Sequence, residues 1–213
     1  MLTRISLAAL SLALFAAPTI AQDAAPETIA CEGVYGPDSS EALVIETFGA
    51  ENVVTGIVPG PEGMEMLATT VFPDDPQKKM QFGWWDEKNL THLSYVEIAP
   101  SQTAPGGMRI GLNVAELEAL NGAPYNISGF WWDYGGSAWF QEGAFVWPEK
   151  GCGVSARFDT DVEIPEGLDV LAISGDVTVP SSEPLLEQLD FRVIDVTIGY
   201  PWPEGLPQPD YED

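Results

Sequence analysis

The sequence has few basic residues: 8 Lys and Arg stand against 33 Asp and Glu, which gives a formal net charge of −25 at pH 7. Binding to a phosphate backbone depends on Lys and Arg that displace condensed counterions, and anionic lipid surfaces attract the same residues. We therefore expect neither nucleic acid nor an anionic membrane surface as a partner. The acidity is interpreted as a diffuse solubilising surface, and binding of Ca²⁺ or of a basic protein stays open as the alternative.

Histidine is represented by His92 alone, and cysteine by two residues. A serine-hydrolase triad needs a histidine beside a nucleophile, yet His92 falls in an expected strand and the chain has no Gly-x-Ser-x-Gly motif. One histidine and two cysteines leave no transition-metal site of recognisable spacing. The glycine pairs lack the flanking residues of a phosphate-binding loop. We predict a protein without metal, cofactor or catalytic residues, which is not an enzyme.

The apolar run at residues 5–17 is too short to cross a bilayer. It follows Arg4 and precedes Thr19 and Ala21, small residues at the two positions that a signal peptidase reads. We predict a signal peptide at residues 1–21, with an uncleaved anchor as the alternative. The mature protein is then periplasmic or secreted, in a Gram-negative bacterium, and has no membrane span.

The two cysteines are Cys31 and Cys152. In an exported chain an oxidising compartment favours a disulfide bond between them, and two buried thiols are the alternative. The bond would tie the start of the mature chain to the end of its aromatic region.

Two short helices are marked by their ends. Asn113 with Glu116 forms an N-cap followed three residues later by a carboxylate, and Gly122 suits the left-handed residue that ends a helix. A helix over 114–121 is therefore expected, and a cap at Ser39 or Ser40 with Gly49 predicts another over 41–48. Their inward faces are expected to comprise Ala42, Ile45 and Phe48 in the first helix, and Val114, Leu117 and Leu120 in the second.

The remaining pattern predicts an α+β fold, mostly antiparallel sheet, as a single domain over residues 22–200. Halves at 31–98 and 107–200 are possible, because the Pro- and Gly-rich segment 99–107 is typical of a linker. Residues 201–213 are expected to be a disordered, acidic, Pro-rich tail. Strands are expected at 51–57, 64–72, 80–86, 90–98, 125–127, 130–134, 138–140, 144–147, 153–159, 168–173 and 191–198.

A helix, a glycine and a Trp-Trp-Asp triplet occur twice in the same order. The first set runs from the helix at 41–48 to the triplet at 84–86, and the second from the helix at 114–121 to the triplet at 131–133. A duplicated helix-strand-strand unit would explain this order, and coincidence in a Trp-rich chain is the alternative.

A motif runs through residues 109–136 and comprises Arg109-Ile110-Gly111, Glu116-Leu117, the stretch from Leu120 to Tyr125, Gly129-Phe130, and Trp132-Asp133-Tyr134-Gly135-Gly136. It resembles a motif of uncharacterised exported bacterial proteins, a family that carries no activity to transfer. At the level of pattern, residues 39–147 also resemble outer-membrane assembly lipoproteins of the SmpA/OmlA type and β-lactamase inhibitor proteins. The resemblance implies helix-plus-sheet units, although the lipid-bearing cysteine of the lipoproteins is missing here.

Three functions are compatible with these observations. The leading prediction is a non-enzymatic module that binds a protein of the cell envelope. A protein that binds or cleaves carbohydrate is the first alternative, with the tryptophans as a platform and Asp86 and Asp133 as a carboxylate pair. An inhibitor of an envelope hydrolase is the second. Arg109 is expected to pair with Asp133 or Glu116, and the candidate structural or binding residues are Arg109, Glu116, Asn121, Gly122, Trp131, Trp132, Asp133 and Tyr134.

Overall fold

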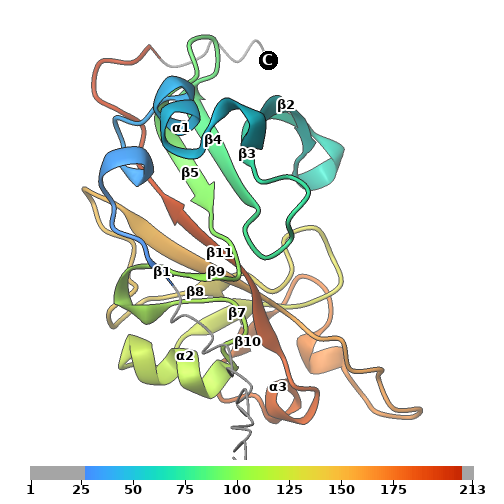
Figure 1. The fold of residues 1–213 in the computed structure, drawn as a ribbon. Helices are drawn as coiled ribbons and strands as arrows, with labels where there is room; N and C mark the ends of the chain where they lie inside the picture. Colours follow the sequence, from blue (N-terminus) through green and yellow to red (C-terminus); the bar gives the residue numbers. More distant parts are fainter. Residues whose placement is uncertain (1–26, 208–213) are drawn as a thin grey trace, which may run out of the picture.

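The computed structural model describes residues 27–207, which form an α+β fold of mostly antiparallel sheet with few helices (Figure 1). The fold class predicted from the sequence is therefore confirmed. The predicted signal peptide at 1–21 lies outside the described residues, as do residues 208–213 of the predicted tail.

A six-stranded antiparallel sheet in the order β2-β3-β4-β5-β11-β9 runs through the molecule (Figure 1). Its strands are β2 (Val53–Pro59), β3 (Glu65–Val71), β4 (Met80–Asp86), β5 (Thr91–Glu97), β11 (Arg192–Gly199) and β9 (Gly153–Asp159). Strand β11 is hydrogen-bonded to β5 on one side and to β9 on the other. Because β5 precedes residues 99–107 and β11 follows them, the two predicted halves share one sheet.

The two faces of this sheet differ in side-chain size. This is seen by comparing two neighbouring rows of residues, each paired across all six strands. One row faces the core and consists of Val154, Ile198, Val96, Phe82, Thr69 and Thr55. The adjacent row lies on the opposite face and consists of Gly153, Gly199, Tyr95, Gly83, Ala68 and Gly56. A Cβ atom on Gly83 would lie 2.0 Å from Tyr95 Cε1, and one on Gly153 would lie 2.3 Å from Trp147 Cε3. Glycine is therefore required where aromatic rings lie against the backbone.

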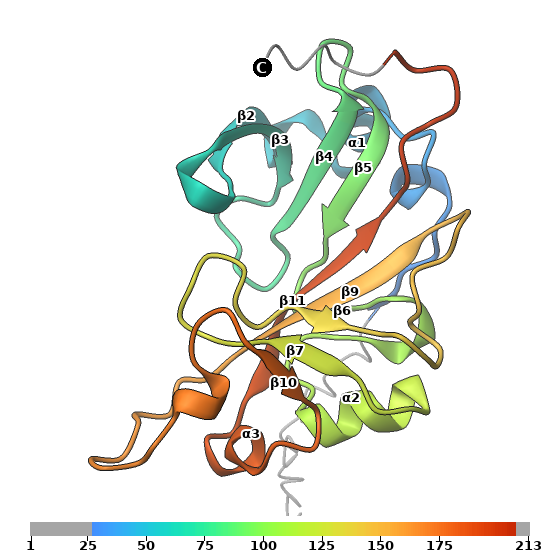
Figure 2. The ribbon, with the colours of Figure 1, turned by 180° about the vertical axis from the view of Figure 1, so that it is seen from behind.

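The lower part of the molecule adds two small sheets and two helices (Figures 1 and 2). The three-stranded sheet has the order β10-β7-β8 and a parallel pair joins β1 to β6. The strands and helices of this part are β1 (Glu27–Thr28), β6 (Gln102–Thr103), α2 (Val114–Asn121), β7 (Asn126–Ser128), β8 (Ala138–Trp139), β10 (Thr178–Pro180) and α3 (Pro184–Gln188). Helix α1 (Glu41–Phe48) packs near β2 in the upper part. Short 3₁₀ turns occupy Gly33–Tyr35, Ala50–Asn52, Pro61–Gly63, Pro105–Gly107 and Leu171–Ile173.

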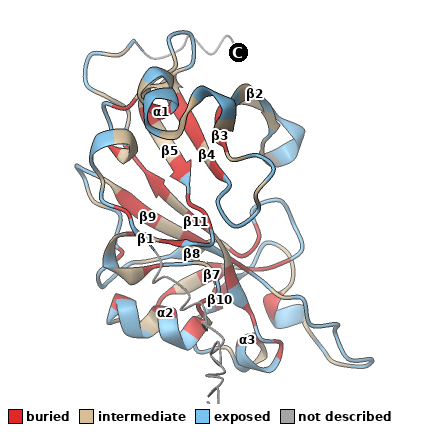
Figure 3. Ribbon diagram, viewed as in Figure 1, coloured by how far each residue is buried: buried red, intermediate tan, exposed pale blue. Residues whose placement is uncertain are grey.

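One hydrophobic core extends through both parts, and its buried positions follow β4, β5, β9 and β11 (Figure 3). Its largest fully buried side chains include Phe82, Phe130, Phe158, Phe191 and Leu93. Phe130 from the lower part packs on Phe191 with ring centroids 4.0 Å apart. The core therefore does not divide at residues 99–107.

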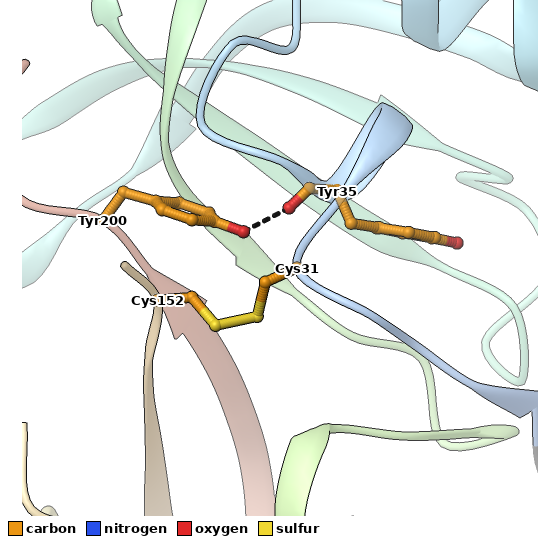
Figure 4. The surroundings of a disulfide bond; sticks show 4 residues. All are labelled: Cys31, Tyr35, Cys152 and Tyr200. Atoms are coloured by element: carbon orange, nitrogen blue, oxygen red, sulfur yellow. Dashed lines mark hydrogen bonds between the residues drawn. A yellow bond between two sulfur atoms is a disulfide. The ribbon is translucent and has the colours of Figure 1, made fainter. Parts of the chain in front are cut away.

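The predicted disulfide bond between Cys31 and Cys152 is present (Figure 4). It spans 121 residues and joins the segment before α1 to the start of β9. Beside it, the Tyr200 hydroxyl donates a hydrogen bond to the Tyr35 carbonyl oxygen. A cross-link of this span restricts the unfolded chain strongly and contributes about 4–5 kcal/mol in the chain-entropy model.

Both predicted helices begin and end where their caps indicated. In α2 the Asn113 side chain accepts from the Glu116 N–H at 2.8 Å, and the Glu116 carboxylate accepts from the Asn113 N–H at 2.9 Å. Gly122 follows with φ +76° in the left-handed region. The predicted faces were partly wrong: Val44 is the buried residue of α1, Leu120 is exposed, and Asn121 is buried in its place.

Three strand predictions were wrong. Residues 130–134 and 144–147 form turns, and residues 168–173 contain a 3₁₀ turn. Aromatic and β-branched residues favoured strands at these positions, but the chain turns there and leaves several of these side chains exposed, among them Trp131 and Val146. The triplet at 131–133 therefore has no strand equivalent to that at 84–86, and the order of parts that suggested duplication is not carried into the structure.

The predicted linker and tail also differ from expectation. Residues 99–107 contain β6, and the buried Gln102 side chain accepts from the Ala99 N–H at 3.0 Å. The part of the tail at 201–207 is packed, because Trp202 contacts Trp85 with ring centroids 4.9 Å apart. The Pro and Gly content predicted a flexible linker and a disordered tail, whereas the hydrogen bond of Gln102 and the ring contact of Trp202 hold the two segments against the fold.

Candidate ligand-binding cleft

A cleft of about 490 Å³ opens between the β7–β8 hairpin and the segment that enters β10. Its size falls in the range of small-molecule sites, about 300–1,000 Å³. The lining residues are Asn126, Ile127, Ser128, Trp132, Tyr134, Ser137, Trp139, Gln141, Asp176, Val177 and Thr178. Three aromatic rings and several uncharged polar side chains therefore share one concave surface.

The aromatic rings of the cleft are exposed but held in place. Trp132 is 38% exposed and its indole Nε1 donates to the Gly129 carbonyl oxygen at 2.8 Å. Trp139 is 61% exposed and its Nε1 donates to Ser128 Oγ at 3.0 Å. Tyr134 meets Trp132 edge to face, with centroids 5.5 Å apart. Because both indole N–H groups are satisfied within the protein, the rings offer their faces to a ligand.

The loop between β7 and β8 carries Trp132 and Tyr134, and its ends are anchored. A Cβ atom on Gly129 would lie 2.4 Å from the Gly175 carbonyl oxygen, so only glycine allows this approach. The Phe130 N–H donates to the Ile173 carbonyl oxygen at 2.7 Å, while its ring enters the core. At the other end Gly136 has φ +78°. The buried residues fix the ends, and the residues between them project outward.

The polar groups of the cleft are hydroxyls and amides, with Asp176 as the one charged residue in the lining. Further carboxylates lie close to the rings. Reduced solvation, followed by the charge of Glu62 on the Pro61–Gly63 turn and that of Asp133, raises the pKa of Tyr134. The electrostatic environment of the cleft is therefore negative.

Asn121 and Gly122 serve the local fold. The Asn121 side-chain amide donates to the Ala123 carbonyl oxygen at 2.7 Å and to that of Glu142 at 3.0 Å. Its Oδ1 accepts from the Phe145 N–H at 3.1 Å. One buried amide thus connects the end of α2 to the loop that follows β8.

Arg109 does not form the predicted ion pair. It is exposed, and Nη1 lies 3.4 Å from the Gly107 carbonyl oxygen. Glu116 is engaged in the capping box with Asn113, and Asp133 is exposed in the β7–β8 loop. The expected pairing of Arg109 with Glu116 or Asp133 was therefore wrong, because helix capping and loop geometry place these carboxylates elsewhere.

Asp86 and Asp133 are not brought into one site. Asp86 accepts from the Asn89 N–H at 3.0 Å and from its side-chain amide at 2.6 Å, which closes the turn between β4 and β5. It lines a different hollow, beside Trp85 and Trp202, whereas Asp133 belongs to the β7–β8 loop. The carboxylate pair suggested for glycoside cleavage is therefore not formed.

Of the candidate residues, the cleft contains Trp132 and Tyr134, while Trp131 is exposed outside its lining. Sequence reasoning missed the other residues of the cleft. Trp139 could have been found, because it lies in an expected strand, at 138–140, where side chains alternate between the two faces. Asp176 and Thr178 had no such signal, because they are distant in sequence from the hairpin that they face.

A search of protein-family models, of curated proteins and of solved structures finds no match to this chain. The resemblance of its motif to exported bacterial proteins, to SmpA/OmlA-type lipoproteins and to β-lactamase inhibitor proteins stays a prediction. Within residues 27–207, no helix is long and apolar enough to cross a membrane, and no group of three or more His, Cys, Asp or Glu is placed to hold a metal ion.

Proposed function

We propose that this protein is an exported, non-enzymatic binding protein that holds a saccharide in the cleft between the β7–β8 hairpin and β10. The presence of a disulfide agrees with an oxidising compartment such as the periplasm or the cell exterior. The observation that carries the proposal is the pair of exposed indole rings, Trp132 and Trp139, whose N–H groups are bonded internally.

Saccharide chemistry fits this surface. A pyranose ring presents C–H groups on its faces, which favour contact with aromatic rings, and hydroxyls on its rim, which need hydrogen-bond partners. Asn126, Gln141 and Thr178 line the cleft beside the rings and supply amide and hydroxyl groups. Binding needs no acid–base pair, which agrees with the separation of Asp86 from Asp133.

The proposal is tested by titrating neutral oligosaccharides into the protein, with tryptophan fluorescence and calorimetry as readouts. Trp139→Ala and Trp132→Ala should each weaken binding about tenfold or more, because each removes one stacking face. Trp131→Ala is the matched control: it is 49% exposed in the same loop but does not line the cleft. It should bind like the unaltered protein.

Two results would contradict the proposal. The first is a lack of response to a panel of gluco-, xylo- and chito-oligosaccharides. The second is an equal loss of affinity in Trp131→Ala and Trp139→Ala, which would show that the cleft is not the site.

Binding of an envelope protein at the same rings is the second candidate. Exposed Trp and Tyr are the residue types that dominate protein interfaces, and Trp131 and Val177 extend the apolar surface beyond the rings. A protein partner should therefore lose affinity with Trp131→Ala as well, which a saccharide should not. The inhibitor function has no further support from the cleft and stays a prediction.

A further inference from the structure

The charge around the cleft restricts the class of saccharide that it can hold, provided that the proposed function is correct. Asp176 lines the cleft, and no Lys or Arg does. Asp133 stands between Trp132 and Tyr134 in the chain and is exposed on the same loop. A ligand on the rings therefore meets carboxylates without a compensating cation.

The nearest arginine in the sheet register is already neutralised. Arg157 forms an isolated bridge with Ser137 of the cleft, but its Nε lies 2.8 Å from Asp195 Oδ2, in an ion pair. A second arginine, Arg192, pairs with Asp190 at 2.8 Å. Both guanidinium groups pair with acids of β11 or of the residues before it, and neither side chain lines the cleft.

Glu62 adds a third carboxylate from a distant part of the chain. It lies on the Pro61–Gly63 turn between β2 and β3, and its charge acts on the Tyr134 hydroxyl at the cleft. The turn is distant from the cleft residues in sequence, but Glu62 is close enough to Tyr134 for its charge to act on it. The negative field is therefore built from three separate segments.

We propose that the cleft selects saccharides that carry a free amine, such as glucosamine oligomers, over neutral sugars of the same length, and rejects those that carry carboxylates. The protonated amine lies near Asp176 while the sugar ring lies on Trp139 or Trp132. An ion pair at a partly exposed site changes affinity by about fivefold, and a carboxylate on the ligand reverses the sign. Salt screens this preference but leaves the stacking contact in place.

The test compares three oligosaccharides of equal length: glucosamine, N-acetylglucosamine and galacturonate oligomers. Titrations at about pH 5.5 keep the amine protonated and the carboxylates ionised. At low ionic strength the glucosamine oligomer should bind about fivefold more tightly than the N-acetylated one, and the galacturonate oligomer should bind about fivefold more weakly. High salt should bring the first two affinities together.

Asp176→Asn should reduce the preference for the amine, because it removes the one carboxylate in the cleft lining, while the N-acetylated oligomer binds as before. Glu166→Gln is the matched control, since it removes the same charge from an exposed position outside the cleft. It should leave the preference unchanged.

The outcomes separate the two proposals. Equal affinities for glucosamine and N-acetylglucosamine oligomers, a preference unchanged in Asp176→Asn, or galacturonate binding as tight as that of the N-acetylated oligomer would each overturn the charge selection while saccharide binding stands. If none of the three oligomers binds, the charge selection fails, and saccharide binding fails with it when the gluco- and xylo-oligosaccharides do not bind either.

Discussion

The two Trp-Trp-Asp triplets, at residues 84–86 and 131–133, have the same letters but opposite surroundings. Trp84 is 3% exposed, lies in β4 between two partner strands, and donates from Nε1 to Thr69 Oγ1 at 3.0 Å. Trp131 is 49% exposed, has φ +65° and lies in a turn. The comparison shows that the strand neighbours, and not the triplet, decide whether a tryptophan becomes core or surface.

The acid of each triplet follows the same division. Asp86 accepts two hydrogen bonds from Asn89 and closes the β4–β5 turn. Asp133 is exposed on a loop whose rings line the cleft. The first triplet therefore stabilises the fold, and the second lies at the surface.

The largest expected effect separates the two triplets directly. Trp84→Ala should lower the free energy of unfolding by about 3–5 kcal/mol, because it leaves a cavity and removes the buried hydrogen bond from the indole to Thr69. Trp131→Ala should change it by about 0.5 kcal/mol or less. Urea unfolding followed by circular dichroism measures both. Equal losses in the two variants would remove the distinction between core and surface triplets.

Glycines beside the triplets should sharpen the comparison with an intermediate effect. A Cβ atom on Gly136 would lie 2.0 Å from the Phe158 carbonyl oxygen, and the residue has φ +78°, so Gly136→Ala should destabilise by about 3 kcal/mol. On Gly83 the clash is with the Tyr95 ring, which can move, and Gly83→Ala should destabilise by about 1–2 kcal/mol. Thermal unfolding of the two variants measures which substitution destabilises more. A larger effect of Gly83→Ala would mean that the β7–β8 loop accommodates an added methyl group more easily than β4 does.

The smallest expected effect concerns the acid of the first triplet. Hydrogen bonds from the Asn89 side chain and backbone hold the pKa of Asp86 below its ordinary value. A depressed pKa contributes stability at neutral pH that is lost as the pH falls through the folded-state value. Asn89→Ala should raise the pKa of Asp86 and lessen the loss of stability at acid pH. Carboxyl chemical shifts followed by NMR titration measure this, and an unmoved Asp86 would contradict it.

Local signals in the sequence predicted the elements that depend on local contacts. Caps at Asn113 and Gly122 defined α2, and the strand expected at residues 80–86 coincides with β4. Residues 130–134 were misassigned because an aromatic run has high strand propensity, whereas the close approach of Gly129 to Gly175 turns the chain. Because this contact joins residues that are distant in sequence, it produces no periodic pattern of hydrophobic residues from which it could be predicted.

The candidate cleft could be predicted only in part for the same reason. Trp132 and Tyr134 stood out by composition, but Asp176 and Thr178 come from a segment that the sequence could not place beside them. Thr178 is brought to the cleft by its pairing with Ser128 between β10 and β7, a long-range contact that the sequence alone does not reveal. Sequence reasoning found two of the three rings, Trp132 and Tyr134, and missed Trp139 and the polar residues that line the cleft beside them.

The position of β11 also determines when the chain can fold. This strand is the last of the described strands in sequence, yet it lies between β5 and β9 and completes the sheet that runs through both parts. Pairings between distant residues are slow to form, and a chain still lacking residues 192–199 has β5 and β9 without their shared neighbour. The six-stranded sheet therefore cannot be completed before residues 192–199 are available, which suits a protein proposed to be translocated before it folds.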